Sequence, residues 1–170
     1  MHRAQFVARM VKAADIAKKK GAVINTPAAI AQAALESGWG NSLLAAKYNN
    51  LFGMKAGTLW KGETVMLWTR EWVKETGQYI KVKAKWRVYA SWNECLVDYS
   101  QFIQGRSYYR DALPHADKPH GDGDMEKWVA HLVDRDTPGE LAWATGPNYV
   151  AKVLAQADQI AAILRQLPAA

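Results

Sequence analysis

A single glutamate closes an apolar segment that is followed at once by glycines and a tryptophan. Residues 33–40 read AALESGWG, which leaves Glu36 as the only carboxylate, next to Trp39. Partial burial against an aromatic ring disfavours the charged form of a carboxylic acid, which can then donate a proton near neutral pH. A glutamate near a helix C-terminus is also commonly a solvated residue beside a glycine cap. Both interpretations of Glu36 stay open on its local sequence alone.

A second unusual segment follows at residues 48–55 (YNNLFGMK). It is too apolar for a surface loop and too rich in asparagine and glycine for a regular helix. Half-buried loops of this kind commonly line binding sites. Asn49 and Asn50 are suited either to satisfying buried backbone groups or to hydrogen bonding a polar ligand, and the sequence leaves both roles open.

Cleavage of a glycosidic bond commonly uses two carboxylates across a cleft. One protonates the leaving oxygen, and the other activates water or stabilises positive charge. Glu63, Glu71 and Glu75 are the candidates for a partner to Glu36. Glu71 follows the most apolar strand-like run, whereas Glu63 lies in a turn-like KGE sequence. Spacing alone favours Glu71 over Glu63 only slightly as the partner of Glu36.

Helical periodicity predicts most of the elements that must position these side chains. Apolar residues recur at helical spacing over residues 3–20, and lysines close that helix. Thr26 and Pro27 then resemble an N-cap and a first-turn proline of a helix that continues to Glu36. The remaining helices are predicted at residues 42–47, 91–104, 125–133 and 147–167, with a long loop at residues 105–124.

Between residues 58 and 90 the apolar period changes from helical to two. Residues 80–88 (IKVKAKWRV) alternate apolar and basic side chains, which predicts a half-exposed strand. Weaker strands are predicted at residues 63–69 and 71–73, before a turn at residues 74–78. We therefore expect an α+β fold, with one domain over residues 1–170 and a small antiparallel β-lobe at about 58–90. The lobe would flank a cleft with Glu36 at its edge.

Composition indicates which kinds of partner the protein can bind. The net charge of +6 favours an anionic partner, but the basic residues are scattered and form no nucleic-acid-binding motif. An anionic surface such as a bacterial wall fits this charge better than nucleic acid. No sequence window approaches the length and hydropathy of a membrane span, and the N-terminal residues do not follow a signal-peptide pattern. Cys95, the only cysteine, lies on an apolar helix face and is expected to be a buried structural thiol.

Eight tryptophans are unusual in so short a chain. Most are expected in the core, although Trp60 and Trp68 adjoin polar residues and have flat faces on which a sugar ring can stack. The histidines and aspartates of residues 105–124 match no metal-ligand spacing. We therefore expect neither a metal ion nor a cofactor.

Several segments occur in an order that is specific as a series. They are residues 31–40 (AQAALESGWG), 48–56 (YNNLFGMKA), 60–62 (WKG), 69–71 (TRE) and 85–89 (KWRVY). Together they resemble glycoside hydrolase family 73, the endo-β-N-acetylglucosaminidases of peptidoglycan, over roughly residues 10–155. The resemblance implies a lysozyme-like fold and cleavage of the β-1,4 bond between N-acetylglucosamine and N-acetylmuramic acid.

The resemblance also implies roles for individual residues. Glu36 matches the general acid and Glu71 the second carboxylate, with the choice between Glu71 and the substrate's own N-acetyl group left open. Trp143 stands where the family usually has a tyrosine of the active site, so that role falls into doubt or passes to Tyr109 or Tyr149. The expected substrate contacts are Trp39, Asn49, Asn50, Phe52, Trp60, Tyr109, Trp143 and Tyr149.

The resemblance implies peptidoglycan glycan strands as substrate and an anionic cell wall as the surface bound. We expect a monomer that binds no nucleic acid and does not insert into a membrane. A catalytic domain without a signal peptide or wall-binding repeat resembles a bacteriophage endolysin, released from the host cytoplasm to act on the wall in the periplasm or outside the cell, or a trimmed bacterial autolysin. The alternatives are a lytic transglycosylase, a muramidase, and a non-catalytic glycan-binding module.

Overall fold

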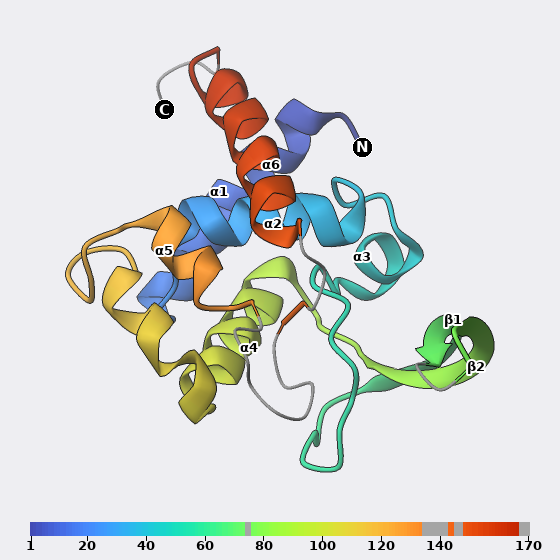
Figure 1. The fold of residues 1–170 in the computed structure, drawn as a ribbon. Coiled ribbons are helices and arrows are strands. Elements are labelled where there is room, and N and C mark those ends of the chain that lie inside the picture. Colours follow the sequence, from blue (N-terminus) through green and yellow to red (C-terminus); the bar gives the residue numbers. More distant parts are fainter. Residues whose placement is uncertain (74–75, 134–142, 145–147, 167–170) are drawn as a thin grey trace.

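The structure is a computed structural model that describes residues 1–73, 76–133, 143–144 and 148–166. Its elements are α1 (Arg3–Lys19), α2 (Thr26–Ser37), α3 (Leu43–Tyr48), β1 (Thr64–Val73), β2 (Gln78–Arg87), α4 (Trp92–Gln104), the 3-10 helix η1 (Ser107–His115), α5 (Met125–Ala130) and α6 (Tyr149–Leu164). The expected α+β class is confirmed, because the helices gather in one body and the β1–β2 hairpin extends to one side (Figure 1). None of the described helices has the length and apolar character needed to cross a membrane.

Helix α2 lies at the centre of the helical body, where α1, α5 and α6 pack against it (Figure 1). Its residues 28–34 are all buried, and five of those seven are alanine. Alanine favours the helix, and its small side chain lets neighbouring helices approach closely. A helix that is apolar on every side is a core helix, so any polar side chain within it needs partners inside the protein.

Two details differ from the prediction. The N-cap of α2 is Asn25, whose side chain accepts a hydrogen bond from the Ala28 amide at 3.1 Å. Thr26 is already helical, and its hydroxyl donates to Asp117 instead. The long loop expected at residues 105–124 is wrong for its first half, where η1 forms because Tyr109 and Ala112 turn into the core.

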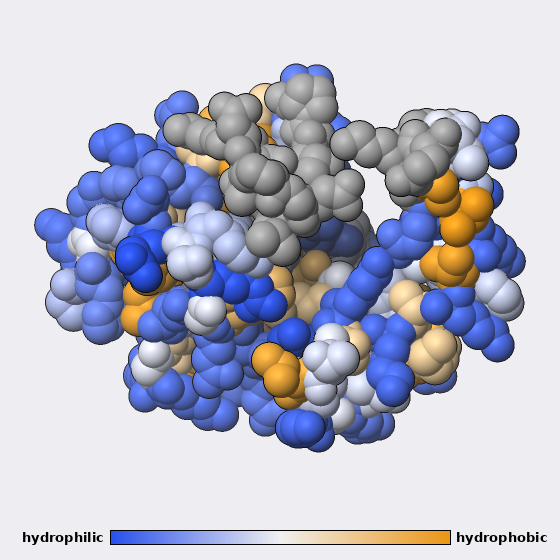
Figure 2. Space-filling model, turned by 60° about the horizontal axis from the view of Figure 1, so that its bottom comes forward, coloured by the Kyte–Doolittle hydropathy of each residue, from blue (hydrophilic) through white to orange (hydrophobic). Residues whose placement is uncertain are grey.

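The hairpin pairs β1 and β2 antiparallel, with Thr64 opposite Arg87 at its root. The two weaker strands predicted separately form the single strand β1, and residues 74–75 of the expected turn lie outside the described residues. Most of the hairpin is exposed, including Met66 and Ile80, so hydrophobic side chains reach the surface of this arm (Figure 2). Near its root β2 becomes buried at Trp86.

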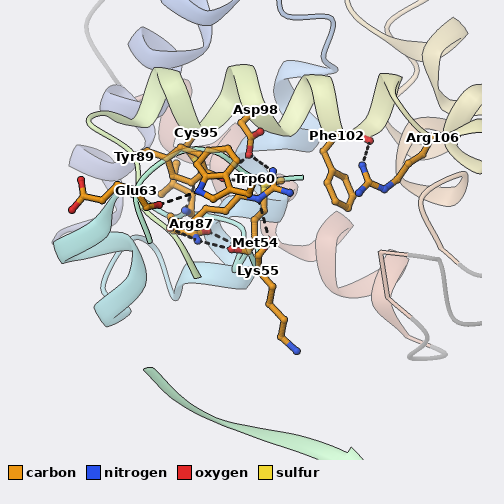
Figure 3. Close-up of polar contacts among 12 residues, drawn as sticks. Met54, Lys55, Trp60, Glu63, Arg87, Tyr89, Cys95, Asp98, Phe102 and Arg106 are labelled. Atoms are coloured by element: carbon orange, nitrogen blue, oxygen red, sulfur yellow. Dashed lines mark hydrogen bonds and ion pairs between the residues drawn. The ribbon is translucent and has the colours of Figure 1, made fainter. Parts of the chain in front are cut away.

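An almost buried ion pair fastens the hairpin root to α4 (Figure 3). The Arg87 guanidinium donates to Asp98 Oδ2 at 2.6 Å, and the Tyr89 hydroxyl donates to the same oxygen at 2.6 Å. Burial raises the pKa of Tyr89, and the neighbouring Cys95 and Asp98 raise it further, so the phenol stays a donor. Removing either charged partner would leave the other uncompensated in the interior.

Cys95 lies on α4 beneath this root. It is fully buried and accepts a weak hydrogen bond from the Leu51 amide at 3.5 Å. Burial raises the pKa of the Cys95 thiol to about 12, so the thiol stays protonated and unreactive. The prediction of a buried structural thiol is confirmed.

Candidate active site

The chain turns away immediately after α2, which leaves Glu36 in the last turn of the helix. Gly38, Trp39 and Gly40 have φ values of 57°, 58° and 75°, all in the left-handed region. A Cβ on Gly40 would lie 3.1 Å from the Phe6 ring, so both the conformation and the packing require glycine there. Glu36 itself stays exposed.

Trp39 does not form the expected aromatic wall beside Glu36. The residue is 8% exposed. Its ring packs edge-on against Phe6 with ring centres 5.6 Å apart, and the Arg3 guanidinium lies 4.6 Å from its centre. The left-handed turn points this indole into the core of the helical body. The aromatic neighbours of Glu36 come from the C-terminal part of the chain.

A cleft of about 720 Å³ opens beside Glu36, between the helical body and the hairpin root. Figure 2 shows the surface hollowed between the body and the hairpin arm. The described residues that line the cleft are Glu36, Leu44, Phe52, Gly53, Met54, Lys55, Trp86, Phe102, Arg106, Tyr108, Tyr109 and Trp143. Among these described residues, Glu36 is the only carboxylate.

One oxygen of Glu36 accepts two hydrogen bonds. The Tyr149 hydroxyl donates to Oε1 at 2.7 Å, and the indole N–H of Trp143 donates to the same oxygen at 3.2 Å. Burial raises the pKa of Tyr149, and the charge of Glu36 raises it further, so the phenol remains a donor. Trp143 has no hydroxyl, yet its N–H places a donor on the carboxylate. No described residue donates to Oε2.

A buried chain of hydrogen bonds stands behind Tyr149. Gln32 lies one turn before Glu36 on α2 and is fully buried. Its Oε1 accepts from the Tyr99 hydroxyl at 2.5 Å, and its Nε2 donates to the Tyr149 hydroxyl at 3.2 Å. Trp128 Nε1, which lies 3.3 Å from the Tyr99 hydroxyl, can only donate. The hydrogen bonds therefore all run in one direction: Trp128 donates to Tyr99, Tyr99 to Gln32 and Gln32 to Tyr149. The chain ends with Tyr149 donating to Glu36.

Glu71 lies on β1 and is half-exposed. Its Oε1 pairs with the Lys55 ammonium at 2.5 Å, and Lys55 is a cleft residue. Glu71 itself is not among the residues that line the cleft, so this ion pair is its link to the cleft edge. Glu63 is exposed and lies instead beside Trp60, whose indole donates to the Glu63 carbonyl at 3.0 Å.

The two asparagines hold backbone groups. Asn49 ends α3 with φ at 54°, and its amide donates to the Tyr89 carbonyl at 2.9 Å. Asn50 is 1% exposed, exchanges two hydrogen bonds with Met54 and donates to the Arg87 carbonyl at 2.9 Å. Of the two roles that the sequence left open, the structure shows the backbone role.

The aromatic candidates divide between two places. Phe52 and Tyr109 line the cleft, and Phe52 stacks on Tyr99 with ring centres 4.3 Å apart. Trp60 instead lines a separate cavity of about 440 Å³, with the Arg87 guanidinium 4.7 Å from its ring centre. The structure thus brings together Glu36, Phe52, Tyr109, Trp143 and Tyr149, and it places Trp39, Asn49, Asn50 and Trp60 elsewhere.

Gln32, Lys55, Phe102 and Arg106 are site residues that the sequence analysis missed. Gln32 left a signal, because it is the single polar side chain in the alanine-rich run before Glu36. In the described chain no cluster of three or more metal-ligating side chains forms. His115, one of the residues weighed as a metal ligand, lies 3.0 Å from Asp122.

Comparison with known proteins gives the family. The glucosaminidase model, described as mannosyl-glycoprotein endo-beta-N-acetylglucosaminidase, matches residues 11–162. The chain is 33% identical over 160 residues to peptidoglycan hydrolase FlgJ of Pseudomonas aeruginosa, covering 92% of this chain and 36% of that protein. It is 39% identical over 127 residues to exo-glucosaminidase LytG of Bacillus subtilis, covering 74% of this chain and 40% of that protein. It therefore spans less than half the length of either relative.

A solved structure has the same fold. The glycoside hydrolase domain of Salmonella typhimurium FlgJ, in a C-terminally truncated form, superimposes with a TM-score of 0.68 at 32% identity. The match covers 95% of this chain and 99% of that one. The match covers nearly the whole of both chains, and the chain belongs to glycoside hydrolase family 73, with the lysozyme-like α+β fold that the sequence predicted.

Proposed function

We propose that this chain is the catalytic domain of a peptidoglycan hydrolase that cuts the β-1,4 bond between N-acetylglucosamine and N-acetylmuramic acid. The observation that carries the proposal is the hydrogen bonding of the two carboxylate oxygens of Glu36 at the cleft. Two donors hold Oε1, no described residue donates to Oε2, and Glu36 lines the cleft. Donors on Oε1 stabilise the carboxylate that a general acid becomes once it has given up its proton.

Glu36 Oε2 donates its proton to the glycosidic oxygen as the bond to the anomeric carbon breaks. The charge that appears on the carboxylate is stabilised by the Tyr149 O–H and the Trp143 N–H, which already donate to Oε1. Water then adds to the oxocarbenium-like sugar. Glu71 activates that water, or the substrate's acetamido group assists first.

Relatives named peptidoglycan hydrolase and exo-glucosaminidase support a peptidoglycan substrate. We further propose that the domain acts as a monomer on the anionic bacterial wall, in the periplasm or outside the cell. A phage-encoded enzyme would reach the same place after release from the host.

The test is product analysis of digested cell walls. A glucosaminidase leaves a reducing N-acetylglucosamine, which borohydride converts to glucosaminitol. Mass spectrometry of the reduced digest should find glucosaminitol as the main new end, and Glu36→Gln should lower its release by at least about 10², with folding intact. Muraminitol would identify a muramidase, anhydromuramyl ends would identify a lytic transglycosylase, and no fragments at all would identify a binding module.

A further inference from the structure

Arg106 presents a guanidinium of fixed orientation to the cleft. It follows α4, and its Cζ lies 3.4 Å from the centre of the Phe102 ring. Its Nη1 also donates to the Phe102 carbonyl at 2.9 Å (Figure 3). Stacking and this hydrogen bond together hold the plane of the guanidinium, while its other N–H groups stay available.

Among the described residues of the cleft, Lys55 and Arg106 are the two cations, and they differ in their partners. The Lys55 ammonium is already paired with Glu71. Within the part of the chain that the structure describes, no carboxylate lies within ion-pairing distance of Arg106. Arg106 is half-buried, so an anion bound there would be partly removed from water and bound more strongly than at an open surface.

Arg106 lies on the same wall of the cleft as the general acid. Trp143 donates to Glu36, and its ring meets Phe102 edge-on with ring centres 5.7 Å apart. Phe102 in turn carries the Arg106 guanidinium. Two aromatic rings therefore separate the acid from the cation, so a group bound by Arg106 belongs to a sugar beside the bond that is cut.

We propose that Arg106 binds a carboxylate carried by a muramyl residue of the glycan strand, and that it makes the enzyme prefer anionic over neutral β-1,4 glycans. The inference rests on the proposed function. N-acetylglucosamine is neutral, whereas the muramyl residue carries a carboxyl group on its lactyl side chain or on the stem peptide attached there. A planar guanidinium matches a carboxylate with two parallel hydrogen bonds.

The experiment compares Arg106→Gln and Arg106→Lys with the unmodified protein on three soluble substrates. These are glycan strands with stem peptides, strands freed of peptides by an amidase, and peptide-free strands whose carboxyl groups have been converted to amides. Arg110→Gln is the matched control, because it removes the same charge from an exposed position of the neighbouring η1. Melting temperatures establish that every variant is folded.

For Arg106→Gln we expect kcat/KM on at least one carboxylate-bearing strand to fall about tenfold, mainly through KM, as for the loss of one charge-assisted pair. Arg106→Lys should lose less, and Arg110→Gln should match the unmodified protein. A loss only with stem peptides assigns the carboxylate to the peptide. A loss only on the peptide-free strands assigns it to the lactyl group, whose carboxyl is tied up as an amide while a peptide is attached. On amidated strands Arg106→Gln should equal the unmodified protein.

An equal loss on the amidated strands would overturn the proposal, because Arg106 would then act only through its packing on Phe102. Unchanged rates on all three substrates would overturn it as well. Failure of the unmodified protein to cut any strand would instead reject the proposed function.

Discussion

Tyr149 and Glu36 lie 113 residues apart in the chain and share a 2.7 Å hydrogen bond. Tyr149 begins α6 and Glu36 lies in the last turn of α2, so the packing of α6 on α2 delivers the phenol to the carboxylate. The surroundings of the acid are therefore a product of tertiary packing.

Tyr149→Phe should lower kcat about tenfold or more. The substitution keeps the ring and removes one of the two donors to Oε1, and a hydrogen bond to a charged group is worth roughly 1.5–3 kcal/mol. Strand-cleavage kinetics at neutral pH measure the effect. A variant with unchanged kcat and an unchanged melting temperature would show that this donor plays no part in catalysis.

Gln32→Met should also lower kcat, because it removes the donor that turns the Tyr149 proton toward Glu36. The decisive measurement is a double-mutant cycle with Tyr149→Phe. If Gln32 acts through Tyr149, the double variant should lose little more kcat than Tyr149→Phe alone. Fully additive losses would mean that Gln32 only supports the fold.

Substitutions at Trp143 can remove or replace the group that donates to Glu36. Trp143→Phe removes the N–H that reaches Glu36 and should lower kcat several-fold. Trp143→Tyr restores the side chain usual in the family and should retain more activity, since a hydroxyl also donates. Equal kcat values for the two variants would show that the ring, rather than the donor, matters at this position.

Glu71→Gln should impair turnover more than Glu63→Gln. Glu71 pairs with a residue of the cleft, whereas Glu63 is exposed beside Trp60 and serves as the control on the same lobe. The loss at Glu71 should be smaller than at Glu36 if the substrate's acetamido group assists. Equal and slight effects at both positions would mean that the hairpin shapes the cleft and that neither carboxylate takes part in turnover.

Binding of the Glu36→Gln variant to purified walls should weaken as salt rises from about 0.05 to 0.5 M. The net charge of +6 is attracted to an anionic surface over a distance set by the Debye length, which falls to a few ångströms over this range. Co-sedimentation of the inactive variant with walls measures the bound fraction. Binding that does not respond to salt would contradict an electrostatic contribution.

Local sequence was sufficient for the α-helices, the hairpin and the position of Glu36, although it missed η1. Periodicity located the helices within a few residues, and the alternation of residues 80–88 located β2. The apolar setting and the glycine-rich turn placed Glu36 in the last turn of a helix. These features depend on neighbours in the chain, which a sequence displays directly.

What the sequence did not contain was the orientation of side chains after the turn. Trp39 adjoins Glu36 in the chain, but three successive positive φ values carry it into the core. Conversely, Gln32, Tyr99 and Tyr149 meet only because α4 and α6 come together around α2. Contacts at such separations depend on packing, and no local pattern reports them.

The single cysteine beneath the hairpin root has a practical consequence. Cys95 is fully buried, and its pKa of about 12 makes it unreactive while the root is closed. A thiol reagent at pH 8 can therefore modify the native protein only when the structure around Cys95 opens. The labelling rate under native conditions would then report the opening of this part of the core, without any engineered probe.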